Sequence, residues 1–459
     1  MLIDFSIENF RSFGAEQTLN LVASNKLQEH PEHCTAVANT GKSALRTAVI
    51  YGANAAGKSN LVRAMLFAQA FIRGTLSFQQ LALDHFRFGK KKNPSAFVCR
   101  YLVDDWIFSY GFAVTPQAVI EEWLDVASGK NREVNVYHRK EQTISVGKLK
   151  AFGSEGEASV RALKALQFLG VRPEQLLLNK IVDLPESHRG KLLDKAVWWF
   201  TDCLTVLLTD SSFPTLIEFL NQDTSFRRFA AAFLQNVGTG IVDLRVEQTE
   251  IEAERVPQEF LKRLQSSKGR EAQISIGGSG VQFHLDPNDP TKIVRDNLAA
   301  LHRVSASDFS LPFQDESDGT QRCLNLLPAL YHLTKQPGVF VIDEINRSLH
   351  PLLCYALMKL FVESCPGGPQ QMIVTTHETH LLDLDLLRRD EIWFAEKDDK
   401  QQTQLYSLAD MKVRNDVRIE KGYLQGRFGG IPFLGDTKKL TELIHCAGNG
   451  KDHAKKTAS

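Results

Sequence analysis

The chain has 459 residues with 54 basic and 54 acidic side chains, so its formal net charge is zero. Hydrophobic residues make up 43% and charged residues 24% of the chain, which is typical of a folded protein and excludes a disordered one. The balanced charge also excludes a protein that coats nucleic acid with a globally basic surface.

The sequence favours a protein that lies in a reducing compartment and is not inserted in a membrane. No apolar run approaches the roughly 20 residues that span a bilayer, and the first residues lack the charged and apolar regions of a signal peptide. The seven cysteines are scattered and form no C-x-x-C pair, a usage typical of free thiols rather than of disulfides or a zinc site. We therefore expect a cytoplasmic protein of two or three packed units.

The N-terminal part combines strands with one helix. Residues 3–7 alternate apolar and polar side chains, which predicts a half-buried strand, and residues 19–23 fit its partner. Residues 24–46 are polar and are predicted to form a loop. The apolar run 47–51 predicts a buried parallel strand, and a helix is expected over 60–72.

A predicted hairpin follows, and beyond it the predicted secondary structure changes from strands to helices. Two aromatic-rich runs within 97–114 predict a hairpin, and residues 120–126 predict another strand. Beyond residue 150 the pattern is mostly helical over 157–235 and mixed over 240–300. The glycine cluster 277–280 favours a hairpin turn over a phosphate loop, because no helix follows it.

Strands and helices alternate again in the C-terminal part. We expect helices over 319–331 and 352–362, and strands over 339–342, 372–375, 392–395 and 404–407. The small, polar tail from residue 448 is predicted to be flexible.

A phosphate-binding motif lies between the strand at 47–51 and the helix at 60–72. The run G-A-N-A-A-G-K-S fits the pattern G-x-x-x-x-G-K-[ST], whose backbone N–H groups turn toward phosphate oxygens. Lys58 would supply a positive charge to the β- and γ-phosphates, and the Ser59 hydroxyl would ligate Mg²⁺. The helix N-terminus adds a further preference for anions. The predicted nucleotide contacts are Gly52, Asn54, Ala56, Gly57, Lys58, Ser59 and Asn60.

Two later predicted strands are followed by candidate metal-binding and catalytic residues. Asp343 and Glu344 follow the apolar run 339–342, at the strand end where α/β sheets bind ligands. Asp343 would hold Mg²⁺ directly or through water, and Glu344 would orient or deprotonate the attacking water. An Asp-Glu pair after a strand is common by itself. The presence of a phosphate loop in the same chain is what favours a catalytic role for this pair. His377 ends the next strand at the same edge, and we interpret it as a γ-phosphate contact rather than a structural histidine.

A fourth motif, S-D-G-T-Q-R, opens the predicted helix at 319–331. Ser317 has the character of an N-cap, so a simple helix start explains it. Ser317, Gly319 and a helix N-terminus would equally make a second anion site. The residues alone leave both interpretations open.

These four elements, in this order, resemble the ABC-type ATPase head. The S-D-G-T-Q-R run stands where that family has its signature, residues 347–351 look like its D-loop, and His377 like its switch histidine. Residues 7–13 are similar to the opening strand of the SMC and RecF branch, which implies that Arg11 lies near the nucleotide phosphates. More closely, the chain resembles compact prokaryotic AAA family ATPases of anti-phage defence operons, such as abortive-infection, PARIS, Septu and OLD-like systems. The runs E-S-D-G-T-Q-R, D-E-I-N-R-S-L-H-P and G-R-F-G-G-I-P are the most specific pieces.

The resemblance implies an α/β fold, an ABC-type P-loop ATPase head with a mixed sheet, flanking helices and an antiparallel β subdomain. We expect the halves of the head at 1–150 and 301–435, an inserted and mainly helical lobe at 151–300, and a flexible tail at 436–459.

The resemblance also implies a homo-oligomer built on a head-to-tail dimer. ATP and Mg²⁺ would lie between the phosphate loop of one copy and Ser317 and Gly319 of the other, with hydrolysis through Glu344. The signature departs from the transporter sequence L-S-G-G-Q. The usual Mg²⁺-ligating glutamine has only Gln79 and Gln80 as candidates, by location alone.

Three functions compete. The first is a sensor and regulatory subunit in anti-phage defence, controlling a separately encoded effector such as a nuclease, with DNA or a phage protein as trigger. The stretch after His377 is too short for a fused Toprim nuclease. The alternative is a RecF- or SMC-like DNA-binding ATPase of repair or recombination, using basic runs such as Lys90-Lys91-Lys92, which a solvated loop explains as well. For the third, nucleic-acid cleavage by the middle region, no supporting pattern is present.

Overall fold

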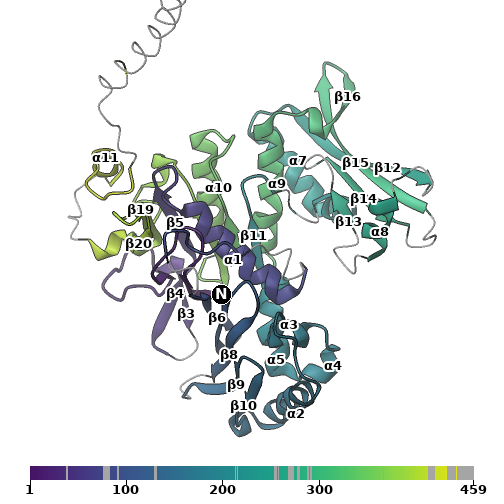
Figure 1. Ribbon diagram of the computed structural model, residues 1–459. Helices are drawn as coiled ribbons and strands as arrows, with labels where there is room; N and C mark the ends of the chain where they lie inside the picture. Colours follow the sequence, from purple (N-terminus) through teal and green to yellow (C-terminus); the bar gives the residue numbers. More distant parts are fainter. Residues whose placement is uncertain are drawn as a thin grey trace, which may run out of the picture.

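The computed structural model describes most of the chain, and Figure 1 shows its path. The described residues are 1–37, 40–75, 83–89, 93–128, 132–211, 213, 216–252, 256, 258–266, 273–275, 280–286, 289, 292–364, 366–411, 419–431 and 441.

A six-stranded, mostly parallel sheet forms the centre of the protein. Its strand order is β11-β17-β18-β5-β19-β20, and β20 runs antiparallel to β19. Every residue of β5 and β17 is buried, as expected for strands covered on both faces. The strands predicted at 47–51, 339–342, 372–375, 392–395 and 404–407 are confirmed. The six members are β5 (Thr47–Gly52), β11 (Leu204–Leu207), β17 (Gly338–Ile342), β18 (Gln370–Thr375), β19 (Ile392–Lys397) and β20 (Thr403–Ser407).

Helices cover both faces of this sheet (Figure 1). Side chains of β5 alternate between two cores: Ala48 and Ile50 lie in one with residues of α1, whereas Val49 and Tyr51 lie in the other with residues of α9 and α10. This period of two follows from strand geometry. The three helices, each predicted, are α1 (Lys58–Arg73), α9 (Asp318–Leu333) and α10 (Pro351–Ser364).

A seven-stranded antiparallel sheet lies on the α1 side. Its order is β10-β9-β8-β7-β6-β1-β2, and the predicted hairpin, first strand and strand at 120–126 are all part of it. Phe97 and Phe112 stack with ring centroids 5.1 Å apart, and both share a core with Met65 of α1. The strands are β1 (Leu2–Glu8), β2 (Gln17–Asn20), β6 (Ser95–Val103), β7 (Trp106–Val114), β8 (Val119–Ser128), β9 (Val134–Lys140) and β10 (Thr143–Val146).

The region predicted as one inserted lobe, 151–300, is divided between three places. Its first helices pack on the antiparallel sheet, where Trp199 stacks on Tyr101 with ring centroids 4.5 Å apart. A single π-helical turn, η3 (Trp199–Cys203), then leads into β11, the edge strand of the central sheet. The predicted boundary is therefore wrong at this point, because four residues of the middle region pair with β17. The helices are α2 (Gly153–Leu169), α3 (Leu177–Val182), α4 (Glu186–Arg189) and α5 (Lys191–Trp198).

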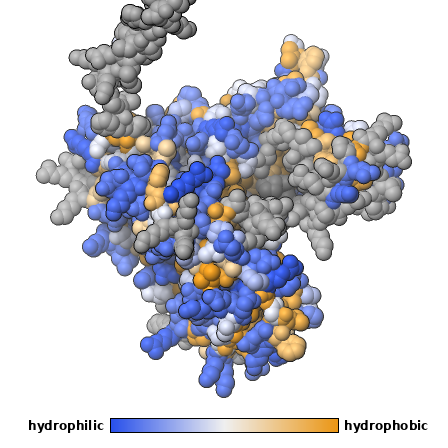
Figure 2. Space-filling model, viewed as in Figure 1, coloured by the Kyte–Doolittle hydropathy of each residue, from blue (hydrophilic) through white to orange (hydrophobic). Residues whose placement is uncertain are grey.

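The third place is a lobe that is largely β-structure rather than mainly helical. The long strands β12 and β15 pair antiparallel, and β13 and β14 form the hairpin predicted around the glycine cluster 277–280, of which residues 277–279 lie outside the described part. Apolar side chains are exposed near the tip of the β15–β16 hairpin (Figure 2): Val304, Phe309 and Leu311. The elements are α6 (Leu216–Gln222), α7 (Thr224–Asn236), β12 (Ile241–Glu252), α8 (Gln258–Ser266), β13 (Gln273–Ser275), β14 (Val281–Leu285), β15 (Lys292–Val304) and β16 (Ser307–Pro312).

The loop predicted at 24–46 contains a small hairpin instead. β3 (Cys34–Val37) and β4 (Lys42–Leu45) pair antiparallel, and their four-residue lengths are too short to produce a periodic signal. A short helix, α11 (Ile419–Leu424), follows the central sheet. The predicted flexible tail, 436–459, lies outside the described residues except for residue 441. The single-turn helices are η1 (Pro31–His33), η2 (Lys150–Phe152), η6 (Phe313–Asp315), η7 (Thr379–Leu381), η8 (Arg389–Glu391) and η9 (Leu408–Asp410).

None of the described helices combines the length and the apolar character needed to cross a membrane. The described cysteines are free thiols, in agreement with the absence of a disulfide pattern: Cys34, Cys99, Cys203, Cys323 and Cys354.

Candidate nucleotide-binding site

The phosphate loop connects the end of β5 to the start of α1. Gly57 has a φ of 113°, and a Cβ added there would lie 2.0 Å from the Oγ1 of Thr403 and 2.8 Å from the Oγ of Ser12. A Cβ at Gly52 would lie 2.4 Å from the carbonyl oxygen of Ala395. Both glycines are therefore required by close packing, and the loop rests on β19, β20 and the turn after β1.

Lys58 is buried at the base of this loop, with 4% of its surface exposed. Its Nζ donates hydrogen bonds to the carbonyl oxygens of Gly52 (2.8 Å) and Ala53 (3.2 Å), and lies 3.0 Å from Nε2 of His377. Burial lowers the pKa of Lys58 to about 8, against the opposing effect of the nearby carboxylates of Glu344 and Asp343. Lys58 is thus charged at neutral pH, with its ammonium group directed at the loop.

Burial and the charge of Lys58 lower the pKa of His377 below its usual 6.5. The imidazole is therefore neutral at pH 7, and Nε2 accepts the hydrogen bond from Lys58. The loop and the strand end at His377, predicted separately, meet at this contact.

Asp343 is a buried carboxylate that accepts three hydroxyl hydrogen bonds. Ser59 (3.1 Å) and Thr375 (2.7 Å) donate to its Oδ1, and Thr209 (3.0 Å) donates to its Oδ2. These residues come from the start of α1, the end of β18 and the segment after β11. They meet because the carboxyl ends of parallel strands lie at one edge of the sheet.

Glu344 has a left-handed backbone conformation, with a φ of 47°. Such a conformation is uncommon for a residue other than glycine and recurs at functional sites. It is held by a hydrogen bond of 2.8 Å from the Glu344 N–H to the Oγ1 of Thr375. The chain therefore turns away from the strand direction at Glu344, whose half-buried side chain follows directly after Asp343.

The signature segment begins α9. Ser317 is its N-cap, and the Oγ accepts a hydrogen bond of 3.2 Å from the Thr320 N–H, which confirms the helix-start interpretation. A Cβ at Gly319 would lie 2.7 Å from the carbonyl oxygen of Ser348. The buried guanidinium of Arg322 donates to the carbonyl oxygens of Asp343 (2.9 Å) and Thr209 (3.3 Å). Arg322 thus attaches the signature helix to the strand end that carries the carboxylates.

Asn346 connects the D-loop-like segment to the switch histidine. Its Oδ1 accepts hydrogen bonds from the Thr376 hydroxyl (3.0 Å) and from the backbone N–H of His377 (3.3 Å). The position of His377 is therefore fixed from two sides, by Lys58 and by Asn346.

These motifs have a counterpart among known families. The family described as "AAA domain, putative AbiEii toxin, Type IV TA system" matches residues 48–156 and 205–383, which together are more than half of the chain. The chain belongs to this family. Membership of this AAA-domain family implies nucleotide binding at the phosphate loop, and the strand order and motif order give the fold of an ABC-type P-loop ATPase head.

Several solved structures are similar to this AAA-domain protein over most of its length. The Smc head bound to the C-winged helix domain of ScpA is 15% identical, with a TM-score of 0.37, and the match covers 88% of this chain and 97% of that chain. The SMC head domain from Thermotoga maritima is 11% identical, with a TM-score of 0.36, over 90% and 99%. The recombination mediator protein RecF is 12% identical, with a TM-score of 0.29, over 88% and 98%. No curated protein matches the chain.

The predicted site residues are not all found in the same place. Arg11 forms an ion pair with Asp84 at 2.8 Å. Its neighbour Ser12 contacts the phosphate-loop segment instead, because the Ser12 Oγ accepts a hydrogen bond of 2.8 Å from the Asn60 side chain. Asn54 is exposed and Ala56 is buried. Gln79, Gln80 and the basic run 90–92 lie outside the described residues.

Four site residues escaped prediction. The Thr403 hydroxyl donates to the Ala56 carbonyl oxygen and lies within hydrogen-bond distance of the Ser12 hydroxyl, each at 2.8 Å. Thr209 donates to Asp343. Neither threonine belongs to a motif, so the sequence carried no signal for them. Arg322 lies inside the signature run and Asn346 inside the run D-E-I-N-R-S-L-H-P, so the position of each in a recognised motif was a signal that could have been used.

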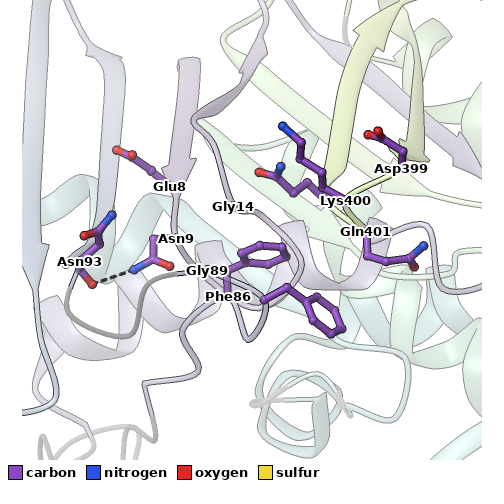
Figure 3. Close-up of a pocket in the computed structure, with 11 residues that line it drawn as sticks. Glu8, Asn9, Gly14, Phe86, Gly89, Asn93, Asp399, Lys400 and Gln401 are labelled. Carbon is purple, nitrogen blue, oxygen red and sulfur yellow. Dashed lines mark hydrogen bonds between the residues drawn. The ribbon is translucent and has the colours of Figure 1, made fainter.

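A cavity of about 490 Å³ lies beyond the turn after β1 (Figure 3). Asn9 closes one side of it by donating a hydrogen bond of 2.7 Å to the carbonyl oxygen of Asn93. Phe86, Gly14 and the 399–402 turn form other walls. No phosphate-loop residue lines the cavity, so the phosphate-binding chemistry is separate from it.

Proposed function

We propose that the protein binds ATP with Mg²⁺ at this site and hydrolyses it between two copies arranged head-to-tail. The observation that carries the proposal is the convergence of the Ser59, Thr209 and Thr375 hydroxyls on the buried carboxylate of Asp343. Mg²⁺ is bound by carboxylates together with phosphate oxygens, so this oxygen-rich donor set fits it.

Each residue has a separate role in the proposed reaction. Ser59 and Asp343 hold Mg²⁺, which when bound neutralises charge on the phosphates. Lys58 exchanges its present acceptors, the loop carbonyl oxygens, for phosphate oxygens. Glu344 orients the attacking water and accepts its proton. His377 contacts the γ-phosphate.

The two-copy arrangement is supported by the signature segment. In the described part of the chain, Ser317 contacts Thr320 of its own helix, and Gly319 lies against the carbonyl of Ser348. By the resemblance of this segment to the ABC signature, we place both residues against ATP held by the other copy. ATP then acts as part of the interface, and its hydrolysis shifts the population from closed to open dimers.

A mixing experiment tests the shared site. Lys58→Ala removes the phosphate contact, and Gly319→Ala places a methyl group against the Ser348 carbonyl oxygen, so each variant alone should be inactive. In a mixed dimer the intact loop of the Gly319→Ala chain faces the intact signature of the Lys58→Ala chain. An equal mixture should regain up to about a quarter of wild-type ATPase activity, because half of the dimers carry one complete site. A mixture as inactive as its components would mean that each site belongs to one chain.

The biological role that we propose is regulation of a separately encoded effector, such as a nuclease, in anti-phage defence. The support is the family description, which names a toxin and a type IV TA system, together with the resemblance of the signature and D-loop runs to ATPases of defence operons. DNA or a phage protein is the proposed trigger.

Phage challenge tests this role. Cells that express the protein with its neighbouring genes should survive infection, and Lys58→Ala or Glu344→Gln should remove the protection at equal protein levels. Protection that persists in both variants would separate defence from the nucleotide site. Strong stimulation of the ATPase by duplex DNA without any neighbouring gene would instead favour a repair ATPase.

A further inference from the structure

A second group of ligand-type side chains lies apart from the nucleotide site. His30, Glu32 and His33 belong to the connection between β2 and β3, around the single-turn helix η1. They face the segment that follows the switch histidine, where Leu384 and Glu391 contact them. None of the three takes part in the nucleotide chemistry proposed above.

Their ligand atoms have the spacing of a metal site. The Nδ1 of His30 lies 3.4 Å and the Nε2 of His33 lies 3.7 Å from the same oxygen, Oε1 of Glu32. All three atoms lie within 4.8 Å of one another. Two ligands at about 2.0–2.1 Å from a tetrahedral Zn²⁺ are separated by about 3.4 Å. The two rings now stack, with centroids 4.8 Å apart and planes inclined by 24°. Zinc binding therefore requires both rings to turn until their lone pairs point at one position.

The outer hydrogen bonds set both histidine tautomers for coordination. Nε2 of His30 lies 2.8 Å from the carbonyl oxygen of Leu384, which can only accept, so this nitrogen carries the proton. Nδ1 of His33 lies 2.9 Å from the Oε2 of the buried Glu391 and donates to it. In neutral rings the lone pairs then lie on the two nitrogens that face Glu32. A histidine that donates its outer N–H to a carbonyl or carboxylate is the usual second layer of a metal site.

The frame around the cluster is rigid, and one side is open. His33 and Glu391 are fully buried, whereas the Glu32 side chain is 44% exposed. The Glu32 carbonyl oxygen accepts hydrogen bonds from Gly367 N–H (3.0 Å) and from the Arg46 guanidinium (3.3 Å), which hold the backbone of η1 in place. The exposed side leaves a position for water as a fourth ligand.

We propose that His30, Glu32 and His33 bind a zinc ion. The set of two histidines and one glutamate with an open position is a known zinc ligand combination. The ion pins the connection between β2 and β3 to the segment from Leu384 to Glu391. The competing explanation is two protonated imidazoles that pair with Glu32 and Glu391 without any metal.

Zinc titration of the full chain tests the site. The protein is stripped with a chelator, and Zn²⁺ alone, without nucleotide, is added in competition with a fluorescent zinc indicator. His30→Ala and Glu32→Gln each remove one ligand and leave the buried His33–Glu391 pair intact. His138→Ala is the matched control, because His138 also pairs with a surface carboxylate, Glu121, at 2.7 Å.

The proposal predicts that wild type and His138→Ala bind zinc equally and gain thermal stability on binding. His30→Ala and Glu32→Gln should each raise the Kd for Zn²⁺ by about 100-fold or more. Co²⁺ in the same site should give the visible absorption of a four-coordinate ion, and Glu32→Gln should remove it. Wild-type protein that binds no zinc would overturn the proposal, as would zinc binding that is unchanged in both ligand variants.

Discussion

Thr209 donates a hydrogen bond of 3.0 Å to the Oδ2 of Asp343, although the two residues are 134 positions apart. Thr209 follows β11, whose register pairs Leu207 with Ile342 in parallel. This pairing brings a residue from the middle of the chain to the carboxylate proposed to hold Mg²⁺. The middle region therefore contributes to the candidate nucleotide site.

Thr209→Val should slow ATP hydrolysis without abolishing ATP binding. Valine has the shape of threonine but cannot donate to Asp343, so the carboxylate loses one of its three hydroxyl partners. The loss of a hydrogen bond to a charged group costs about 1.5–3 kcal/mol, so we expect kcat to fall by about tenfold or more. Steady-state ATPase kinetics and nucleotide titration measure the two effects.

Thr205→Val is the control for this change. Thr205 lies on the same strand, pairs with Phe340 of β17 and is half-buried. Its substitution should leave kcat unchanged. An equal loss in both variants would show that the strand, and not the hydroxyl of Thr209, is what matters.

ATP affinity should weaken as the pH rises above about 8. Burial lowers the pKa of Lys58 to about 8, so the free protein loses the ammonium charge there. Phosphate binding requires that charge, and one proton must be taken up on binding at higher pH. The Kd for a non-hydrolysable ATP analogue should therefore rise by up to about tenfold per pH unit above this value.

Calorimetric titrations between about pH 7 and about pH 9.5 measure this slope. In Lys58→Arg the guanidinium stays charged throughout this range, so its Kd should be larger but nearly independent of pH. A slope that is the same in wild type and Lys58→Arg would assign the pH dependence to another group.

The sequence predicted the parts of the site that local patterns specify. The strand at β5, the phosphate loop and α1 follow one another directly, so apolar periodicity and glycine spacing were sufficient to predict them. β11 has only four residues and lies in a mostly helical stretch, and its place is decided by pairing with β17 far along the chain. Thr209 depends on that pairing and could not be predicted. Asn346 and Arg322 lay within recognised runs, but the fold alone brings their partners to them: two backbone carbonyl oxygens for Arg322, and the Thr376 hydroxyl and the His377 N–H for Asn346.

Asn346→Ala should impair hydrolysis through His377. The change removes the acceptor for the Thr376 hydroxyl and the backbone N–H of His377, so the backbone that positions the imidazole loses its hydrogen bond. We expect kcat to fall severalfold and ATP affinity to change little. A double-mutant cycle with His377→Ala measures the coupling: if Asn346 acts through His377, the double variant should be no slower than His377→Ala alone. Additive losses would show that Asn346 acts independently.

Glu122→Ala should destabilise the contact between the antiparallel sheet and α3. Glu122 is fully buried in β8, and its carboxylate accepts hydrogen bonds from the N–H groups of Leu177 (2.7 Å) and Leu178 (2.9 Å). The hydroxyls of Tyr110 (3.1 Å) and Tyr137 (2.9 Å) also donate to it. Its removal leaves these four donors without an acceptor, and such losses in a buried network cost about 3 kcal/mol. The midpoint of denaturant unfolding should fall accordingly.

The neighbouring carboxylate provides the matched control for this loss. Glu121 lies on the opposite face of β8, is 41% exposed and pairs with His138. A surface pair of this kind contributes at most about 1 kcal/mol, so Glu121→Ala should leave the unfolding midpoint almost unchanged. Because the Glu122 network also joins α3 to the sheet, protease cleavage within 170–190 should increase in Glu122→Ala. Equal midpoints for the two variants would mean that the buried network contributes no more than a surface pair, and that α3 is held by its apolar contacts alone.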